Sequence, residues 1–297
     1  HNVVAIDNLS TGRYENVAHL AGNRAFQFVF ETVANEGVMD RLASECDVIF
    51  HLAAAVGVKL IVEKPVNTLE TNLLGTEVAL KMARRYRRKV LLASTSEIYG
   101  KSDQPIFRED GDRLLGPTTK SRWSYSDSKA VDEFLALAYH KEYGLEVVIP
   151  RFFNTIGPRQ TGTYGMVVPR FVRQALRNEP LTVYDDGQMT RCFCSVRDVV
   201  RAVLALAESP AAVGEVFNVG SQEEITILDL ARRILARTGS SSPIRFVPYE
   251  QAYESGFEDM RHRVPDISKI RAAVGWQPEV TLDETLDEVI RQMMKDE

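Results

Sequence analysis

The sequence is poor in cysteine, in long apolar runs and in any excess of one charge. Its three cysteines, Cys46, Cys192 and Cys194, are too few and too irregularly spaced for a disulfide framework or a zinc site. No apolar run reaches the ~20 residues that span a bilayer, and no signal peptide is recognisable. The 36 lysines and arginines are interspersed with 41 acidic residues, for a net charge of −5. Because this leaves no basic stripe, we expect a cytoplasmic protein without a metal site, a nucleic-acid partner or a membrane partner.

A glycine-rich phosphate loop is also missing. The first apolar strand ends at Asp7, and an acidic residue at that point holds the adenosine ribose in dinucleotide-binding folds, ~20 residues after such a loop. No glycine fingerprint precedes Asp7 or follows a later strand. Taken alone, Asp7 is better explained as the start of the turn Asp-Asn-Leu-Ser-Thr-Gly. With the rest of the chain in view, we expect a strand, glycine loop and helix of roughly 25–30 residues before His1 in the natural protein.

What is present alternates between apolar strands and helical segments. Strands are predicted at 3–6, 25–30, 47–52, 90–93 and 146–151, and helices at 38–43, 67–85 and 126–143. This order predicts an α/β fold with a doubly wound parallel sheet. After Asn154 the chain becomes rich in glycine and proline, with helices predicted at 167–178, 197–208, 227–238 and 282–295 and a strand at 243–249. We expect this part to form a smaller, interleaved region over the open end of the sheet.

One hydroxyl cluster and one helix carry the chemistry. Tyr125 and Lys129 are four residues apart, so they share one face of their predicted helix. An ammonium group favours the phenolate, which predicts a lowered pKa for Tyr125 and a role as general base. Thr95, at the end of an apolar strand, can hold a substrate alcohol against that base. A tyrosine and a lysine at this spacing are common by chance, but the order of strand, hydroxyl cluster and helix favours alcohol oxidation with a nicotinamide acceptor.

Several further motifs, in the same order along the chain, resemble the extended short-chain dehydrogenases/reductases. The resemblance is to the nucleotide-sugar epimerase, dehydratase and decarboxylase group, and it covers the whole sequence. The motifs are Asp7-Asn-Leu-Ser-Thr-Gly12, His51-Leu-Ala-Ala54, Asn72-Leu-Leu-Gly-Thr76, Ser94-Thr-Ser-Glu-Ile-Tyr-Gly100, Tyr125-x3-Lys129, Arg151-Phe-Phe-Asn154, Gly157-Pro158, Gly214-x-Val-Phe-Asn-Val-Gly220 and Gly275-Trp-Gln-Pro278.

The resemblance implies a Rossmann-like fold with NAD as cofactor and a UDP-sugar as substrate. It implies an NAD-binding domain over 1–158, to which 192–220 return, and a mainly sugar-nucleotide-binding region over 159–297. Asp7 and Asn8 would meet the adenosine ribose, Glu31 the adenine, and the small Ala53 and Ala54 would pass under the cofactor. The implied cofactor-binding residues are Asp7, Asn8, Ser10, Gly12, Glu31, Ala53, Ala54, Tyr125 and Lys129.

Three more residues would bind the sugar nucleotide by the same resemblance: Asn154, Arg191 and Arg263. A guanidinium group suits phosphate or carboxylate oxygens. Each residue also has a structural explanation. Asn154 fits a turn, Arg191 fits an exposed partner of Asp185 or Asp186, and Arg263 fits a solvated face.

The residues beside Thr95 discriminate between reactions that share C4 oxidation of the sugar. Dehydratases of this group have Thr-Asp-Glu where this chain has Thr95-Ser96-Glu97, so an acid for water elimination is missing. The UDP-galactose epimerases have no glutamate there. Thr95-Ser96-Glu97 followed by Arg-Trp-Ser-Tyr125 is most similar to UDP-glucuronate decarboxylases. Oxidising C4 of a hexuronate gives a β-keto acid, so the protein must only orient the carboxylate and protonate C5, which we assign to Ser96, Glu97 and Arg191.

We therefore predict a catalytic set of Thr95, Ser96, Glu97, Tyr125 and Lys129 that converts UDP-glucuronate to UDP-xylose. A UDP-sugar 4-epimerase, acting on UDP-glucose/galactose or UDP-glucuronate/galacturonate, remains the alternative, since the loop 53–59 differs from that of typical decarboxylases. A non-catalytic dinucleotide-sensing protein on the same fold is a second alternative, supported only by the missing glycine loop.

The predicted helices 67–85 and 126–143 have more apolar residues than a single stripe packed against the sheet requires. The surplus residues are Val78, Leu80 and Met82 on the first helix and Val131, Phe134, Leu135 and Leu137 on the second. The family resemblance implies that these helices pair across a two-fold axis in a homodimer. The alternative is that both face the sheet.

Overall fold

A five-stranded parallel sheet forms the centre of the structure, a computed structural model in which residues 1–162, 165–248, 251 and 260–296 are described. Its strands are β11 (Glu215–Val219), β6 (Val147–Phe152), β4 (Lys89–Leu92) and β3 (Val48–His51) in that order, with β5 (Ser94–Thr95) paired to β6. The buried strands are rich in β-branched and other apolar residues, as parallel sheets covered on both faces require. The carboxyl ends of β3 and β5 lead directly into the segments that carry the predicted site.

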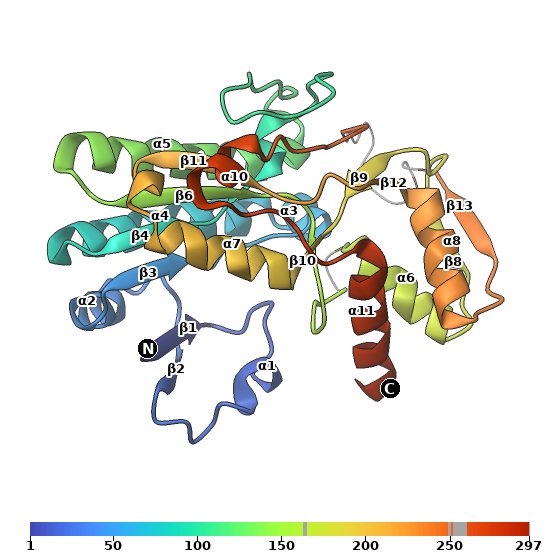
Figure 1. Cartoon of the computed structure of the whole chain (residues 1–297), viewed down its shortest axis with the longest axis horizontal. Coiled ribbons are helices and arrows are strands. Elements are labelled where there is room, and N and C mark those ends of the chain that lie inside the picture. Colours follow the sequence, from blue (N-terminus) through green and yellow to red (C-terminus); the bar gives the residue numbers. More distant parts are fainter. Residues whose placement is uncertain (163–164, 249–250, 252–259, 297) are drawn as a thin grey trace.

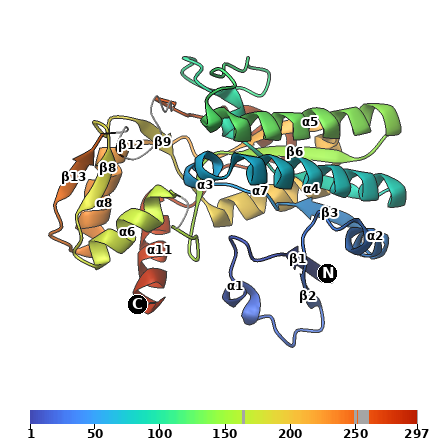
Figure 2. The ribbon, with the colours of Figure 1, turned by 180° about the vertical axis from the view of Figure 1, so that it is seen from behind.

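Helices cover both faces of this sheet (Figures 1 and 2). Helices α4 (Pro65–Tyr86) and α5 (Ser124–Tyr143) lie side by side on one face, where Leu80 and Ala136 pack against β4 and β6. Helices α7 (Val196–Glu208) and α10 (Ser268–Val274) cover the opposite face. This arrangement confirms the doubly wound α/β fold expected from the sequence.

The first two strands stand apart from that sheet. Strands β1 (Val3–Asp7) and β2 (Phe26–Phe30) form a separate parallel pair, drawn at the bottom of Figure 1. Apolar side chains are exposed on both sides of the break: Val3 is 52% exposed and Phe50, on β3, is 40% exposed. Strands β1 and β2 are therefore not part of the central sheet, whereas the sequence predicts one sheet that includes them.

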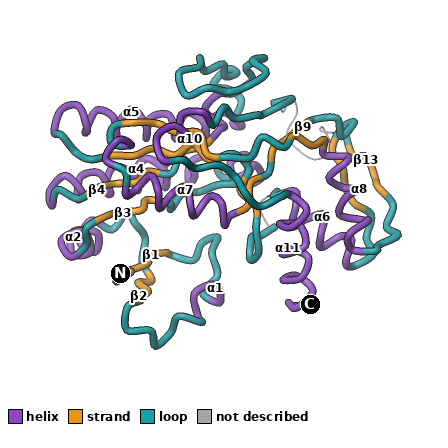
Figure 3. The backbone as a smooth tube through the Cα atoms, in the orientation of Figure 1, coloured by secondary structure: helices purple, strands orange, loops and turns teal. Residues whose placement is uncertain are grey.

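A second region packs around its own core beside the carboxyl ends of the strands. Helices α6 (Val167–Leu176) and α8 (Ile227–Thr238) pack on β8 (Leu181–Tyr184), which forms a parallel pair with β13 (Ile244–Val247), and α11 (Leu282–Asp296) packs against the two helices. Mostly loops and short strands connect this region to the sheet (Figure 3).

The remaining elements are short. The helices are α1 (Glu15–Ala18), α2 (Glu36–Glu45) and α3 (Val58–Glu63), with the 3-10 turns η1 (Ser96–Tyr99), η2 (Ser121–Trp123) and η3 (Pro210–Ala212). The strands are β7 (Thr155–Ile156), β9 (Thr190–Cys192), β10 (Cys194–Ser195) and β12 (Glu224–Thr226). The observed elements follow the predicted segments to within a few residues at each end, except that Tyr249, at the end of the strand predicted at 243–249, lies outside the described residues.

Part of the expected dimer-forming surface is in fact core. On α4, Val78, Leu80 and Met82 are 1%, 0% and 3% exposed, because they face the sheet and α2. On α5, by contrast, Val131 and Phe134 are 51% and 65% exposed. The surplus of apolar residues was thus assigned to the wrong face of α4.

Cys192 and Cys194 are buried free thiols, and burial raises the pKa of each to about 12.

In the part of the chain that the structure describes, no helix combines the length and the apolarity needed to cross a membrane.

Candidate active site

The hydroxyl cluster lies where β5 turns into η1. Thr95 is the N-cap of this turn, and its Oγ1 accepts a hydrogen bond of 3.2 Å from the backbone N–H of Glu97. Gly100 ends the turn with φ of +64°, and a Cβ there would lie 2.1 Å from the carbonyl oxygen of Leu114. Because only glycine fits this position, the turn holds Ser96 and Glu97 in a fixed orientation.

Helix α5 brings its tyrosine and lysine to this turn. Tyr125 and Lys129 are 9% and 3% exposed, and the Tyr125 hydroxyl is hydrogen-bonded to the Thr95 side chain. Ser126, between them on the helix, donates a 2.8 Å hydrogen bond to the carbonyl oxygen of Glu97. The structure therefore brings together the hydroxyl and the base that the sequence places thirty residues apart.

The electrostatics of Tyr125 differ from the expectation. Burial raises the pKa of Tyr125 above its ordinary value, and the Glu97 carboxylate raises it further. The Lys129 ammonium lies 2.7 Å from Oδ2 of Asp132, in a pair that is almost fully buried. The prediction of a lowered pKa for Tyr125 is therefore wrong for this structure, because burial is the largest cause of the rise and the carboxylates of Glu97 and Asp132 add to it.

Glu97 lies between two buried arginines. Its Oε2 is 2.5 Å from Nη1 of Arg122, and its Oε1 is 3.0 Å from Nη2 of Arg263. Burial alone would raise the pKa of Glu97, but the two guanidinium groups, with a smaller effect from Arg191, lower it to about 2. Glu97 is therefore ionised at neutral pH. Of the two tasks predicted for Ser96, Glu97 and Arg191 together, an ionised Glu97 suits the orientation of the substrate and not the protonation of C5.

The remaining predicted catalytic and substrate residues converge on the same place. Arg263 is 5% exposed, so it is not on a solvated face, and its Nη1 donates to Oγ of Ser96 at 3.2 Å. Arg191, on β9, is 7% exposed and donates from Nη1 to the carbonyl oxygens of Thr190 and Met260. Asn154 follows β6 and donates to the carbonyl oxygen of Cys192 at 3.2 Å. Arg191 is therefore buried, and the explanation of an exposed ion pair does not apply.

Sequence reasoning did not assign two residues of this site. Arg122 precedes Tyr125 by three positions and contacts Glu97, and Asp132 follows Lys129 by three positions and binds its ammonium group. The sequence signal for Arg122 is the segment Arg-Trp-Ser-Tyr, whose similarity to decarboxylases does not by itself give the arginine a role. Asp132 had no signal of its own, since an acidic residue three positions after a lysine is ordinary on an exposed helix.

The predicted cofactor residues lie at the carboxyl ends of β1 and β3. Oδ1 of Asp7 accepts a 2.6 Å hydrogen bond from the N–H of Leu9, and Oδ1 of Asn8 accepts one of 3.0 Å from the N–H of Ser10. The turn closes at Gly12, where a Cβ would come within 3.4 Å of the Asp7 carboxylate. An exposed carboxylate at the end of a parallel strand suits the hydroxyls of an adenosine ribose.

The other residues that the sequence predicts at the cofactor follow β2 and β3. Ala53 and Ala54 are half-buried directly after β3. Glu31 accepts from the N–H of Thr32 at 2.8 Å and from Nδ2 of Asn35 at 3.1 Å, so its carboxylate stabilises the turn before α2. Within the described residues, the turn after β1 fits the ribose of NAD and the Thr95 and Tyr125 site fits the reacting alcohol, whereas no glycine-rich turn is present to hold the NAD diphosphate.

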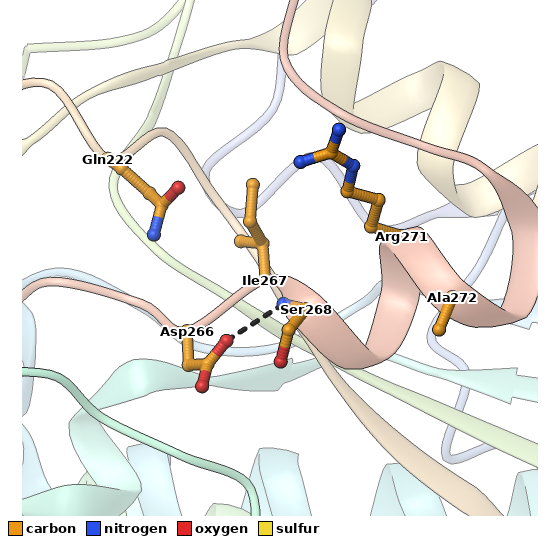
Figure 4. Close-up of a pocket in the computed structure, with 6 residues that line it drawn as sticks. All are labelled: Gln222, Asp266, Ile267, Ser268, Arg271 and Ala272. Atoms are coloured by element: carbon orange, nitrogen blue, oxygen red, sulfur yellow. Dashed lines mark hydrogen bonds between the residues drawn. The ribbon is translucent and has the colours of Figure 1, made fainter.

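A separate pocket lies at the start of α10. It has a volume of about 370 Å³, and in Figure 4 the Asp266 carboxylate accepts a 2.8 Å hydrogen bond from the N–H of Ser268. Its lining residues are Gln222, Asp266, Ile267, Ser268, Arg271 and Ala272. None of the predicted site residues lines this pocket.

A doubly wound sheet with a buried tyrosine, lysine and threonine at the carboxyl ends of its strands defines an extended short-chain dehydrogenase/reductase. The family model described as GDP-mannose 4,6 dehydratase matches residues 1–289, and the chain belongs to this family.

Curated relatives include two kinds of decarboxylase. The chain is 41% identical over 292 residues to a UDP-N-acetyl-alpha-D-glucosaminuronate decarboxylase of Bacillus cytotoxicus, covering 98% of this chain and 89% of the relative. It is 37% identical over 296 residues to UDP-glucuronic acid decarboxylase 1 of Danio rerio, covering 100% of this chain and 68% of the relative.

Solved structures of epimerases share the fold. A UDP-glucuronic acid 4-epimerase from Bacillus cereus, in complex with UDP-glucuronic acid and NAD, superposes with a TM-score of 0.89 at 28% identity, covering 100% of this chain and 92% of that one. A UDP-glucose 4-epimerase from Thermotoga maritima, with UDP-glucose, gives a TM-score of 0.87 at 29% identity, with the same coverage. The family prediction made from the motifs is confirmed.

Proposed function

We propose that the protein is an NAD-dependent nucleotide-sugar decarboxylase that converts UDP-glucuronate to UDP-xylose. The observation that carries this proposal is the charge around Glu97, where Arg122, Arg191 and Arg263 all act on one carboxylate. Three guanidinium groups against one carboxylate give a buried site with an excess of positive charge. Such a site suits a substrate that carries a carboxylate as well as a diphosphate.

Tyr125 serves as the base of the first step. Its phenolate oxygen, next to Thr95, takes the proton of the sugar C4 hydroxyl as C4 becomes a ketone, and the tyrosine is then neutral. NAD, held next to these residues, would supply the hydride chemistry at C4. Thr95 positions the substrate hydroxyl, and Lys129 contributes the positive charge nearest to the tyrosine on α5.

The arginines around Glu97 direct the second step. In the 4-keto hexuronate the bond between C5 and the carboxylate breaks, carbon dioxide leaves, and the bonding electrons enter the C4 carbonyl as an enolate. Ionised Glu97 orients Arg122 and Arg263, which bind the departing carboxylate. Ser96, whose hydroxyl accepts from Arg263, lies where a hydroxyl or its bound water can pass a proton to C5.

The relatives support a UDP-hexuronate as the substrate. The decarboxylases of Bacillus cytotoxicus and Danio rerio are named for two UDP-hexuronates that differ at the sugar 2-position. Both would present the same C4 hydroxyl and the same carboxylate to this site. UDP-glucuronate is the substrate we propose, with Asn154, Arg191 and Arg263 as its contacts.

A 4-epimerase is the second candidate, favoured by the epimerase structures that superpose over the whole chain. To separate the two, the NAD-loaded enzyme is incubated with UDP-glucuronate, UDP-N-acetylglucosaminuronate and UDP-glucose, and the products are identified by mass. Loss of carbon dioxide from UDP-glucuronate supports the proposal. An unchanged mass with UDP-galacturonate accumulating would mean that the enzyme is an epimerase, and turnover of the N-acetyl substrate alone would move the proposal to that sugar.

We also propose that the protein is a homodimer through the outer faces of α4 and α5. These helices lie side by side and expose Leu74, Val131 and Phe134, which are 46%, 51% and 65% exposed. Large apolar side chains clustered on adjacent helices are typical of an interface between subunits. A second copy related by a two-fold axis would cover them in a four-helix arrangement.

A further inference from the structure

The catalytic lysine has a buried acidic partner on its own helix. Nζ of Lys129 lies 2.7 Å from Oδ2 of Asp132, and the two side chains are 3% and 1% exposed. Solvent and salt screen such a pair very little. The negative charge of Asp132 therefore acts on every group around Lys129.

Asp132 also lies beside α4. Its side chain is 1% exposed, and Thr76 on α4, which is fully buried, helps to lower the pKa of its carboxyl group. Oγ1 of Thr76 lies 3.2 Å from Nε2 of His51, the last residue of β3. The carboxylate of Asp132 cannot move away from Lys129 without breaking this buried ion pair.

We propose that Asp132 is a positioning residue that holds the Lys129 ammonium group and, through its own charge, keeps the proton on Tyr125 until substrate and cofactor are in place. This inference rests on the proposed role of Tyr125 as the base. In the unloaded site the lysine charge is offset, so the tyrosine stays a neutral hydrogen-bond donor. The charge balance at Tyr125, rather than the spacing of tyrosine and lysine alone, then sets the pH range of the first step.

The charged groups around Tyr125 determine the direction in which its pKa should move when Asp132 is replaced. Glu97 and Asp132 both raise the pKa of Tyr125, and Arg122 lowers it. Burial, with a smaller effect from Lys129, lowers the pKa of His51 to about 3, so the imidazole is neutral near pH 7.

The pKa of Asp132 depends in turn on burial and on Lys129. Burial raises the pKa of Asp132, with a smaller effect in the same direction from Glu133, and Lys129 opposes this rise. Removing the charge of Asp132 therefore removes one of the two acidic groups acting on Tyr125 and leaves the lysine charge without its offset. Both changes favour the phenolate.

The test is Asp132→Asn, which keeps the shape of the side chain but not its charge. We expect the acidic limb of the pH–rate profile of the NAD-loaded enzyme to move to lower pH by about one unit, since a nearby charge shifts a pKa by about that much or more. In protein labelled with ¹³C at the tyrosine Cζ, the Tyr125 signal, assigned by its loss in Tyr125→Phe, should begin to titrate at correspondingly lower pH. The matched control is Asp127→Asn on the same helix, whose carboxylate is 51% exposed and 2.9 Å from Arg113; it should shift neither readout.

An unchanged profile and an unchanged Tyr125 signal in Asp132→Asn would overturn the proposal, as would a shift to higher pH, which would mean that the lysine had lost its own proton. If Asp132→Asn does not fold, Asp132→Ser tests the same point with a smaller side chain. It also removes the charge beside Lys129, so a shift in the same direction is expected and no shift overturns the proposal. The titration of Tyr125 does not depend on which UDP-sugar is converted, so a failure of the decarboxylase proposal remains distinguishable.

Discussion

Glu97 and Arg263, which are far apart in the sequence, meet in a buried ion pair of 3.0 Å between Oε1 and Nη2. The turn after β5 supplies the carboxylate, and the segment before α10 supplies the guanidinium group. With Arg122 on the other oxygen, this pair makes Glu97 an anchor for two arginines rather than a source of protons.

Arg263 should distinguish hexuronate substrates from neutral sugars. Replacing it with methionine in Arg263→Met removes the contacts with Glu97 and Ser96, and losing a charged hydrogen-bond partner costs ~1.5–3 kcal/mol. We expect the KM for UDP-glucuronate to rise by about tenfold or more, the ratio that 1.4 kcal/mol represents. Arg261→Met is the control, because Arg261 is exposed two residues away. Equal effects of the two substitutions in steady-state kinetics would contradict this assignment.

Tyr125→Phe should abolish turnover and leave nucleotide-sugar binding almost unchanged. The substitution removes only the oxygen that transfers the proton and its hydrogen bond to Thr95. Turnover is followed by carbon dioxide release, and binding by calorimetry with UDP-glucuronate. Activity within tenfold of the wild-type rate would rule out Tyr125 as the base.

Glu97→Gln should lower both decarboxylation and stability, and the loss of stability should depend on pH. The pKa of Glu97 is lowered from 4.5 to about 2 in the folded protein. The carboxylate therefore contributes stability that is fully present above pH 4.5 and is lost as the pH falls through about 2. Urea denaturation should show a clear difference between wild type and variant at pH 7 that shrinks near pH 3. A difference that stays constant across this range would show that the charge of Glu97 is not what stabilises the fold.

The loss of decarboxylation in Glu97→Gln should come from the two arginines that Glu97 orients, and not from a missing proton donor. Glutamine cannot hold two guanidinium groups by charge, so Arg122 and Arg263 lose their fixed orientation. We expect a decrease of roughly 10²-fold in the release of carbon dioxide, the size of effect that misplacing a positioned group by about 1 Å can have. The first hydride transfer, followed by the absorbance of NADH in a single turnover, should slow much less.

Arg151→Met should destabilise the protein far more than a surface change of the same kind. Arg151 makes two hydrogen bonds to Glu133, of 2.9 and 2.7 Å, inside the protein, and it also donates to the hydroxyl of Tyr99. Leaving Glu133 buried without its partner costs ~3–5 kcal/mol. Arg197→Met, which breaks the exposed pair with Glu288, should cost ~0–1 kcal/mol. Denaturation curves with similar midpoints for both variants would contradict the difference.

Phe134→Asp should dissociate the proposed dimer. Light scattering of the wild-type chain should give about twice its mass of 33.4 kDa, and the variant should give the monomer mass. Phe246→Asp is the control, because Phe246 is 51% exposed on β13 in the second region. A wild-type chain that is monomeric at micromolar concentration would remove the dimer proposal.

The sequence was sufficient for the fold class and the family, because both depend on local patterns. Hydrophobic periodicity indicates the alternation of apolar strands with helices, and it predicted β3, β4, β6, α4 and α5 to within a few residues. The segments around Thr95, Tyr125 and Lys129 were predictable for the same reason, since each is a short motif on one element. The family predicted from the motifs was confirmed by the family model and the curated relatives, and the exact site roles remain predictions.

Only the tertiary structure decided the charge state of those residues. Whether Lys129 acts on Tyr125 or is offset by Asp132 depends on burial, which turns an ordinary helical pair into one that water does not screen. Likewise, Glu97 became an ionised anchor because Arg122 and Arg263, from separate parts of the chain, lie against it. The identity of a residue fixes its ordinary pKa, but the neighbours that folding brings within a few ångströms decide which proton it holds.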